Sequence, residues 1–276
     1  MGASDCLLYA DAHSYLMTSR IGIIGGSGVY DPGQFVLEKR LDIDTPYGKP
    51  SGNILLGKLN EVDVAFLPRH GEDHQYPPHK VPYHANIWAM KEAGVESIIS
   101  PCAVGSLNEH HKPGEIVIVD QFIDFTKTRE YTYHHGPETF HLSIADPFCP
   151  AIGQEFRRQG DRLGFDVHGH GTYVCIEGPR FSTKAESRMF QDYADVIGMT
   201  LVPECQLARE MGMCYCSLAM VTDYDVWKDH PVNFEMVMET MKANLHKVSQ
   251  MLENALPRIE GRKCGCASSA DGAPEV

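Results

Sequence analysis

The 276-residue sequence has no apolar run close to the roughly 20 residues that a membrane-spanning helix needs. It is also short of positive charge: 24 Lys and Arg stand against 37 Asp and Glu, a formal net charge of −13 at pH 7. This balance argues against broad binding to the phosphate backbone of nucleic acid. A local cluster of Arg and His can still hold an anionic substrate. We therefore expect neither a membrane nor a nucleic acid as partner.

The N-terminus lacks the basic start of a secretory signal peptide, and Asp5 and Asp11 lie within its first twenty residues. We expect residues 1–20 to be a flexible extension on a cytoplasmic protein. Residues 257–276 are polar and rich in Gly, Ser and Ala, which predicts a disordered C-terminal tail. Between them, residues 21–256 contain no break in composition and no internal repeat, so we expect one folded domain there.

The nine cysteines include no CxxC pair and no zinc-type spacing with histidine. Most lie in or beside apolar segments, where a buried thiol is the default: Cys102, Cys149, Cys175, Cys205, Cys214 and Cys216. Cys264 and Cys266 lie in the polar tail, where exposed thiols could be redox-active or bond to each other. His70, His74 and His79 are separated by a glycine and prolines that break any aligning helix. We predict no metal site.

Segments with strand character alternate with segments of helical spacing throughout residues 21–256. The predicted strands cover 21–28, 62–67, 96–100, 115–123, 171–176, 195–200 and 214–221. The predicted helices cover 81–93, 151–163, 183–193, 203–212 and 234–256, and a long loop covers 124–146. This alternation predicts an α/β fold, a single domain whose central sheet is mixed, largely parallel and flanked by helices. Ligands bind such sheets at the carboxyl ends of the strands.

Glycine-rich or polar loops follow several predicted strands, and a turn of small residues is predicted at 101–106, after the strand 96–100. The loop Gly25-Gly26-Ser27-Gly28 lacks the Gly-Lys-Ser/Thr of a P-loop, and turn residues rather than a helix follow it. We therefore interpret this loop as a tight turn at the end of a strand, in which Ser27 can present its hydroxyl group and its backbone amide to an anion. After the next strand, Arg69 offers a planar fork suited to phosphate, and His70 offers a further donor. A surface ion pair is the alternative for Arg69.

Two carboxylates, Asp223 and Asp225, follow the apolar run 214–221. They could face one cleft if Asp225 begins a loop. Their closeness and burial would then push their pKa values apart, leaving one readier to hold a proton near neutral pH. The alternative is that both only cap the following helix.

Several short motifs occur in a fixed order: Gly25-Gly26-Ser27-Gly28, Pro68-Arg69-His70-Gly71, Tyr83-His84-Ala85-Asn86-Ile87-Trp88-Ala89, Gly105-Ser106-Leu107, Glu177-Gly178-Pro179-Arg180-Phe181-Ser182, Gly198-Met199-Thr200, Val202-Pro203-Glu204 and Thr222-Asp223-Tyr224-Asp225. The ordered set closely resembles the S-methyl-5′-thioadenosine phosphorylases, which belong with the trimeric purine nucleoside phosphorylases. The resemblance covers roughly residues 21–256. It implies the phosphorylase fold and a pentosyltransferase of methionine and purine salvage.

The implied reaction is phosphorolysis: inorganic phosphate, as co-substrate, displaces adenine from methylthioadenosine and gives 5-methylthioribose 1-phosphate. No metal or organic cofactor is required. The implied phosphate site consists of Ser27, Arg69, His70, Cys102, Ala103 and Thr200. Ser27 and Cys102 stand where many relatives carry threonine, so Cys102 is expected to contribute only backbone.

The implied substrate site consists of His74, Phe181, Ser182, Met199, Phe234, Val237 and Met238. Phe181 matches the position that stacks on the purine, and Met199 matches the floor under the ribose. The others, apart from Ser182, match the pocket of the 5′ substituent, whose apolar members suit a methylthio group better than a hydroxyl.

For catalysis, Asp223 is the candidate acid that protonates the leaving purine at N7. Asp225 would accept a hydrogen bond from the exocyclic amine or orient Asp223. The pair should titrate as a coupled unit, so the holder of the proton stays open. The resemblance also implies a homotrimer or homohexamer, in which a residue matching His141 is lent by a neighbouring subunit.

The sequence leaves three other functions open. A phosphorylase of 6-oxopurine nucleosides, such as methylthioinosine or inosine, is the nearest, but relatives with that preference tend to carry Asn at the position of Asp223. A nucleotide-binding or scaffold module without catalysis is the second. A nicotinamide oxidoreductase built on residues 25–28 is the third.

Overall fold

The computed structural model describes residues 20–26, 35–137, 141–228, 234–262 and 264–266, leaving out the side chains of residues 234–236. Its elements are β1 (Arg20–Gly25), β2 (Phe35–Leu41), β3 (Ile54–Leu59), β4 (Val62–Pro68), η1 (Pro78–Lys80), α2 (Tyr83–Glu92), β5 (Val95–Ser106), β6 (Ile116–Val119), β7 (Gln121–Phe125), α3 (Pro150–Leu163), β8 (Val167–His168), β9 (Thr172–Ile176), α4 (Lys184–Gln191), β10 (Val196–Gly198), α5 (Leu201–Glu210), β11 (Cys214–Asp223) and α6 (Phe234–Ile259). None of the described helices is long and apolar enough to cross a bilayer.

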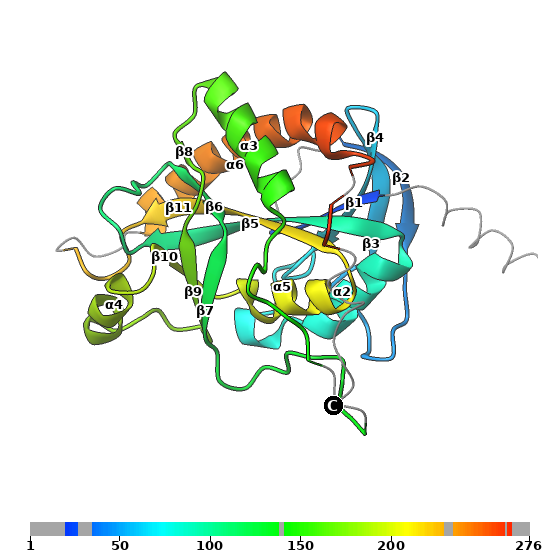
Figure 1. The fold of residues 1–276 in the computed structure, drawn as a ribbon, viewed down its shortest axis with the longest axis horizontal. Coiled ribbons are helices and arrows are strands. Elements are labelled where there is room, and N and C mark those ends of the chain that lie inside the picture. Colours follow the sequence, from blue (N-terminus) through cyan, green and yellow to red (C-terminus); the bar gives the residue numbers. More distant parts are fainter. Residues whose placement is uncertain (1–19, 27–34, 138–140, 229–233, 263, 267–276) are drawn as a thin grey trace, which may run out of the picture.

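All the strands join one mixed sheet, whose main path runs β2-β3-β4-β1-β5-β10-β9-β7, while β11, β6 and β8 branch from β5. Pairing is parallel where β5 meets β1 and β11, and antiparallel where it meets β10. Helices α3 and α6 lie on one side of the sheet, and α2 and α5 lie on the other (Figure 1). The predicted single α/β domain with a flanked, mixed sheet is confirmed.

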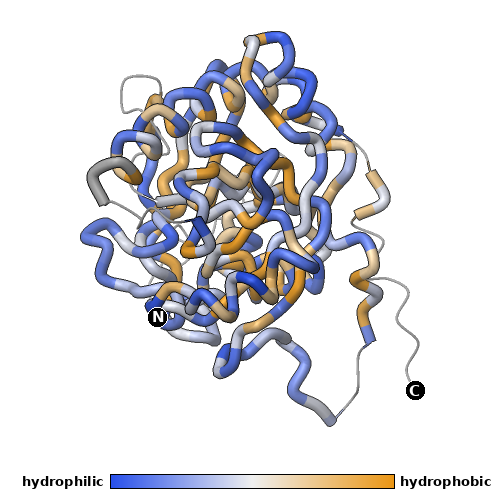
Figure 2. Tube along the Cα trace, turned by 90° about the vertical axis from the view of Figure 1, so that its left-hand side faces the viewer, coloured by the Kyte–Doolittle hydropathy of each residue, from blue (hydrophilic) through white to orange (hydrophobic). Residues whose placement is uncertain are grey.

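Strand β11 shows why the sheet needs helices on both faces. Its side chains alternate between the two hydrophobic cores because successive residues of a strand point in opposite directions. Tyr215 and Ala219 pack with α2 and α5, whereas Cys216 and Leu218 pack with α3 and α6. Apolar segments accordingly gather inside the molecule, and polar segments line its outside (Figure 2).

Most predicted elements are present, and the predicted start of the helix after β9 is confirmed in detail. Thr183 caps α4 by accepting a hydrogen bond from the amide of Glu186, whose side chain returns a bond to the Thr183 amide. This capping box satisfies two amides that would otherwise lack a partner.

Two predicted boundaries inside the sheet are wrong. The stretch 101–106, expected to be a turn, continues β5, because β11 pairs with β5 from Ser97 to Gly105. The stretch 115–123, expected to be one strand, divides at Asp120 into β6, which pairs with β11, and β7, which pairs with β9. Asp120 bonds instead to Gly171: its amide donates to the glycine carbonyl at 3.2 Å, and its carboxylate accepts from the glycine amide at 2.9 Å.

The folded chain extends past both ends of the range 21–256. Arg20 is already part of β1, and α6 continues to Ile259, whose side chain is buried. Cys266, expected in an exposed tail, is buried as well. Residues 1–19 and 267–276, where the flexible extension and half of the tail were predicted, lie outside the described residues.

Candidate active site

A cavity of about 460 Å³ opens where the carboxyl ends of β1, β4, β10 and β11 meet. Each of these strands ends at this edge and brings a different loop to it, and such sheets bind ligands at this edge. The predicted site residues that line the cavity are Arg69, His70, His74, Cys102, Ala103, Phe181, Ser182, Met199, Thr200, Asp223, Asp225 and Val237. The structure thus brings together most of the residues that the sequence selected.

Three predicted residues are not among the lining side chains. Ser27 lies outside the described residues, and so does the side chain of Phe234. The prediction that Met238 lines the cavity is wrong. Its side chain is 52% exposed and is not among the lining residues, whereas Met241 is. Val237 and Met241 of α6 are four residues apart and share a helix face, whereas Met238 is turned by about 100° from Val237.

The cationic end of the cavity is Arg69, which directly follows β4 and is only 2% exposed. Its Nε donates to Glu204 Oε2 at 2.7 Å, and its Nη2 donates to Glu204 Oε1 at 2.9 Å. The surface ion pair considered from the sequence is therefore a buried one. Burial alone would lower the pKa of Arg69, but the Glu204 carboxylate raises it above its ordinary value, so the guanidinium stays charged.

Arg69 has one part of its fork left for a ligand. Its Nη2 also donates to the Ile24 carbonyl at 2.8 Å and to Ser100 Oγ at 2.6 Å. Its Nη1 has, among the described residues, a single contact of 3.4 Å to the Pro101 carbonyl. The predicted planar fork is thus mostly occupied by protein, and Nη1 is the group free to meet an anion.

The sequence missed the residues that hold Arg69 in place. Glu204 is fully buried, although it belongs to α5 and is 135 residues away. The hydroxyl groups of Tyr215 and Ser100 donate to its Oε1 at 2.7 and 3.0 Å. The motif Val202-Pro203-Glu204 drew attention to Glu204, but nothing in its spacing indicated the partner.

His70 lies beside Arg69 and faces the cavity. Its Nδ1 is 2.8 Å from the Tyr76 carbonyl oxygen. Because a carbonyl only accepts, Nδ1 carries the ring hydrogen. Burial, and then the charge of Arg69, lower the pKa of His70 to about 4. At neutral pH the ring therefore offers an acceptor at Nε2, rather than the donor expected from the sequence.

Cys102 and Ala103, predicted to lie in a turn, lie inside β5 and are paired with β11. The Cys102 sulfur is 3.5 Å from Ser217 Oγ, whose own hydroxyl donates to the Ser100 carbonyl. The thiol hydrogen of Cys102 is thus directed at Ser217. Burial raises the pKa of this thiol, which keeps it neutral. The Cys102 side chain is thus hydrogen-bonded within the protein.

The acidic end of the cavity is the pair Asp223 and Asp225. Asp223 ends β11, and Asp225 follows with a φ of 51°, so the second carboxylate does begin a loop. The Asp225 amide donates to Asp223 Oδ1 at 2.8 Å. The Ser182 hydroxyl contacts Asp225 Oδ1 and Oδ2 at 2.8 and 2.6 Å. The pair faces the cavity, so the interpretation as a mere helix cap is wrong.

The pKa of Asp223 is raised above its ordinary value, as predicted. Burial is the largest cause, and the charge of Asp225 adds to it, while hydrogen bonds from Thr222 and from the Asp225 amide act in the opposite direction. Desolvation penalises the charged form of a carboxyl group. Of the two causes that raise this pKa, burial is the larger and the neighbouring carboxylate is the smaller.

A glycine makes room for this acidic pair. A Cβ atom on Gly105 would lie 3.1 Å from Asp223 Oδ1 and 3.2 Å from Asp225 Cβ. These separations are tighter than ordinary van der Waals contacts, so a side chain at this position would push Asp223 Oδ1 and Asp225 Cβ away by a few tenths of an ångström. Between the acidic and cationic ends, the cavity is lined by apolar side chains that include Val104, Ile197 and Met220.

The chain as a whole is similar to known proteins. The chain is 60% identical over 249 residues to an S-methyl-5′-thioadenosine phosphorylase of Pyrococcus abyssi, covering 90% of this chain and 96% of the relative. It is 51% identical over 255 residues to that of Saccharolobus solfataricus, covering 90% and 94%.

Solved structures agree with these relatives. A methylthioadenosine phosphorylase from Schistosoma mansoni in complex with adenine matches with a TM-score of 0.85 at 36% identity, covering 92% of this chain and 96% of that one. A methylthioadenosine phosphorylase from an antarctic soil metagenomic library matches with a TM-score of 0.87 at 43% identity, covering 93% and 92%. A family model described as Phosphorylase superfamily matches residues 20–257, and the chain belongs to that family.

Proposed function

We propose that this protein is an S-methyl-5′-thioadenosine phosphorylase, which uses inorganic phosphate to displace adenine and forms 5-methylthioribose 1-phosphate. The observation that carries the proposal is one cavity with a buried cation at one end and, at the other, the buried carboxyl group of Asp225 beside the partly buried one of Asp223. The relatives named above support it, since they bear this name and one was solved with adenine. The chemistry uses phosphate as co-substrate and needs no metal or organic cofactor.

At the cationic end, phosphate is bound by Arg69 Nη1 together with Thr200 and the backbone of Cys102 and Ala103. Glu204 holds the guanidinium in position. The bond to the leaving purine breaks with positive charge developing on the ribosyl group, and the bound phosphate anion stabilises that charge electrostatically. The buried position of Arg69 supports this role, because charge interactions strengthen where water is excluded.

His70 suits a phosphate that still carries a proton. Its neutral ring presents Nε2 as an acceptor, which a fully deprotonated oxygen would repel. Hydrogen phosphate has one P–OH group that can donate to Nε2, while its other oxygens accept from Arg69 Nη1 and Thr200. This arrangement orients an unprotonated oxygen toward the ribose.

At the acidic end, Asp223 is the proton carrier. The Thr222 hydroxyl lies 3.1 Å from the Val104 carbonyl and 2.8 Å from Asp223 Oδ2. This hydroxyl has one hydrogen: it donates to Asp223 Oδ2 when that carboxyl group is charged, and it can donate to the Val104 carbonyl when Asp223 is protonated and donates in turn to the Thr222 oxygen. A protonated Asp223 satisfies both contacts, and its raised pKa supports the same assignment. The leaving purine then takes this proton at N7.

Asp225 accepts from Ser182 and positions Asp223 through its backbone amide. Its remaining acceptor capacity fits the exocyclic amine of adenine, which a 6-oxopurine lacks. Met199 supports the ribose, and Phe181 stacks on the purine at the rim. The 5′ substituent lies against His74, Val237 and Met241, of which the apolar Val237 and Met241 suit a methylthio group better than a hydroxyl.

The active form is a homotrimer or a homohexamer in which a neighbouring subunit contributes its own copy of His141. His141 is exposed on its own chain, and Phe181 is 67% exposed at the rim of the cavity, so a neighbour has access to both. Light scattering on the purified protein separates a trimer from a hexamer. A monomer with full activity would contradict this arrangement.

A substrate panel at saturating phosphate tests the proposed specificity. Methylthioadenosine, adenosine, methylthioinosine and inosine are compared by kcat/KM. We expect methylthioadenosine to be preferred over adenosine through the 5′ pocket and over methylthioinosine through the Asp pair. A preference for the two 6-oxopurine nucleosides would instead favour the alternative phosphorylase.

A further inference from the structure

Helix α6 forms one wall of the cavity through Val237 and Met241, here called the α6 wall. Asn244 lies three residues after Met241 on the same face, because residues spaced by four and three share one stripe of a helix. Its side chain is 0% exposed, and it is the first buried one among the described side chains of α6, which begin at Val237. Burying an amide costs free energy unless the amide is hydrogen-bonded, so its partner identifies its role.

The partner of Asn244 is the strand that carries the proposed acid. Its Nδ2 donates to the Val221 carbonyl at 2.9 Å. Val221 lies two residues before Asp223, where the register of β11 on β5 shifts: Val221 pairs with Val104, and Asp223 pairs with Gly105. An irregularity of this kind changes the direction of the side chains that follow it. Asn244 therefore holds β11 at the point where the direction of Asp223 is set.

The stability of the fold does not explain this amide. The Val221 carbonyl also accepts from the Gly114 amide at 2.9 Å, so it would keep a partner without Asn244. Asn244 Oδ1 is itself buried and has no hydrogen-bond partner among the described residues. An unpaired buried oxygen destabilises the folded state, and an apolar side chain at this position would avoid that cost. The amide is better explained by what it positions.

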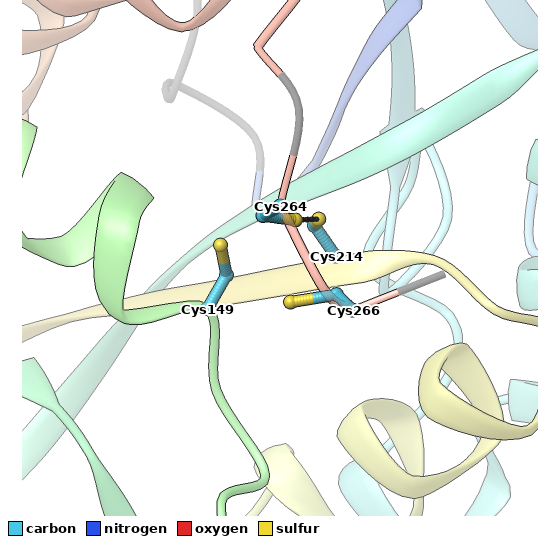
Figure 3. Close-up of side chains that lie close together, drawn as sticks. All are labelled: Cys149, Cys214, Cys264 and Cys266. Carbon is cyan, nitrogen blue, oxygen red and sulfur yellow. Dashed lines mark hydrogen bonds between the residues drawn. The ribbon is translucent and has the colours of Figure 1, made fainter. Parts of the chain in front are cut away.

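The other end of α6 is held separately, where the segment after it returns to the start of β11. Four side chains from three parts of the chain gather there into a cysteine cluster (Figure 3), with all sulfur atoms within 4.8 Å of one another: Cys149, Cys214, Cys264 and Cys266. The sulfurs of Cys214 and Cys264 are 3.0 Å apart. The ten residues of β11, at roughly 3.3 Å each, place this cluster about 30 Å from Asp223. Among the described residues, Asn244 forms the hydrogen bond from α6 to the sheet that lies nearest the α6 wall.

We propose that Asn244 is a positioning residue that fixes the α6 wall relative to Asp223. It does not line the cavity, so it acts through the two elements that it joins. The inference rests on the proposed function, in which the 5′ substituent contacts the α6 wall while the purine contacts Asp223. One nucleoside must fit both contacts at once, and a small misplacement of either costs rate.

Asn244→Leu tests the proposal, because it removes the donor and the unpaired oxygen together and keeps a branched side chain. We expect a midpoint of thermal unfolding no lower than that of the wild type. We expect kcat/KM for methylthioadenosine at saturating phosphate to fall about tenfold or more. The loss for adenosine should be smaller, since its 5′ hydroxyl gains less from the apolar α6 wall. KM for phosphate should not change, because Glu204 holds Arg69 from α5.

Val248→Ala is the matched control. Val248 is also fully buried on α6, four residues after Asn244, and packs in the core without a hydrogen bond from its side chain. Its truncation should lower the midpoint of thermal unfolding. The preference for methylthioadenosine over adenosine should stay that of the wild type.

An Asn244→Leu variant that keeps the wild-type preference and the wild-type kcat/KM would overturn the proposal. If the leucine variant does not fold, Asn244→Ala gives the same comparison with a smaller side chain, and an unchanged preference in that folded variant would overturn it equally. The wild type is assayed first. Its failure to release adenine with phosphate would count against the proposed function, whereas a preference that survives the loss of Asn244 counts against the positioning role alone.

Discussion

Replacing Asp223 by Asn removes the proposed acid while keeping its shape. In the wild type, Asp223 contacts the Asp225 amide and the Thr222 hydroxyl, both at 2.8 Å. In the variant, the Asn amide oxygen can accept from the Asp225 amide, and its NH₂ group can donate to the Thr222 oxygen. The variant should therefore fold like the wild type. What it loses is a transferable proton.

A general acid is typically worth about 10²–10⁴-fold in rate. At 1.36 kcal/mol per tenfold, this is about 3–5 kcal/mol of the activation barrier. We expect kcat/KM for methylthioadenosine at saturating phosphate to fall by that factor. The loss for methylthioinosine should be smaller, since an amide can donate to a 6-oxopurine.

The pH profile gives an independent check with a definite sign. An acid must be protonated to work, so wild-type activity should fall as the pH rises through the raised pKa of Asp223. Asn does not titrate, so the variant should lack this limb. Asp192→Asn, at an exposed position outside the cavity, is the matched control and should behave as wild type. A loss below about threefold, or equal losses on the two purine types, would refute the assignment.

Three further predictions follow from the same geometry. Glu204→Gln leaves the buried charge of Arg69 without its charged partner, which costs about 3–5 kcal/mol of folding free energy. At about 2 °C per kcal/mol, the midpoint of thermal unfolding should fall by at least about 6 °C. An unchanged midpoint would contradict the pairing. Met241→Ser should raise KM for methylthioadenosine, whereas Met238→Ser should not, and kinetics of the two variants side by side decide this. Gly105→Ala should lower kcat/KM about tenfold or more by displacing the acidic pair, and unaltered kinetics would show that the pair tolerates the methyl group.

The sequence predicted features whose signal is local. The apolar run of β11 and the carboxylates after it are contiguous, so their position at a strand end could be derived from one short stretch. The capping box of Thr183 and Glu186 is likewise contained within four residues. Both are confirmed because neighbouring residues supply all the partners.

Features that depend on distant partners could not be predicted. Glu204 completes the environment of Arg69 from 135 residues away. β5 extends to Ser106 because β11 pairs beside it, and nothing within residues 101–106 reveals that neighbour. The choice of Met241 over Met238 depends on the rotation of α6 against the cavity, which residue type alone does not specify. The cysteine cluster is assembled from three such distant segments.

In the proposed reaction, phosphate attacks from the Arg69 end of the cavity while adenine leaves at the Asp223 end. The most direct measurement incubates the purified protein with methylthioadenosine, with and without inorganic phosphate, and identifies both products by chromatography. We expect adenine and 5-methylthioribose 1-phosphate in equal amounts, and no adenine without phosphate. Adenine released together with free methylthioribose, or at a rate independent of phosphate, would refute this reaction.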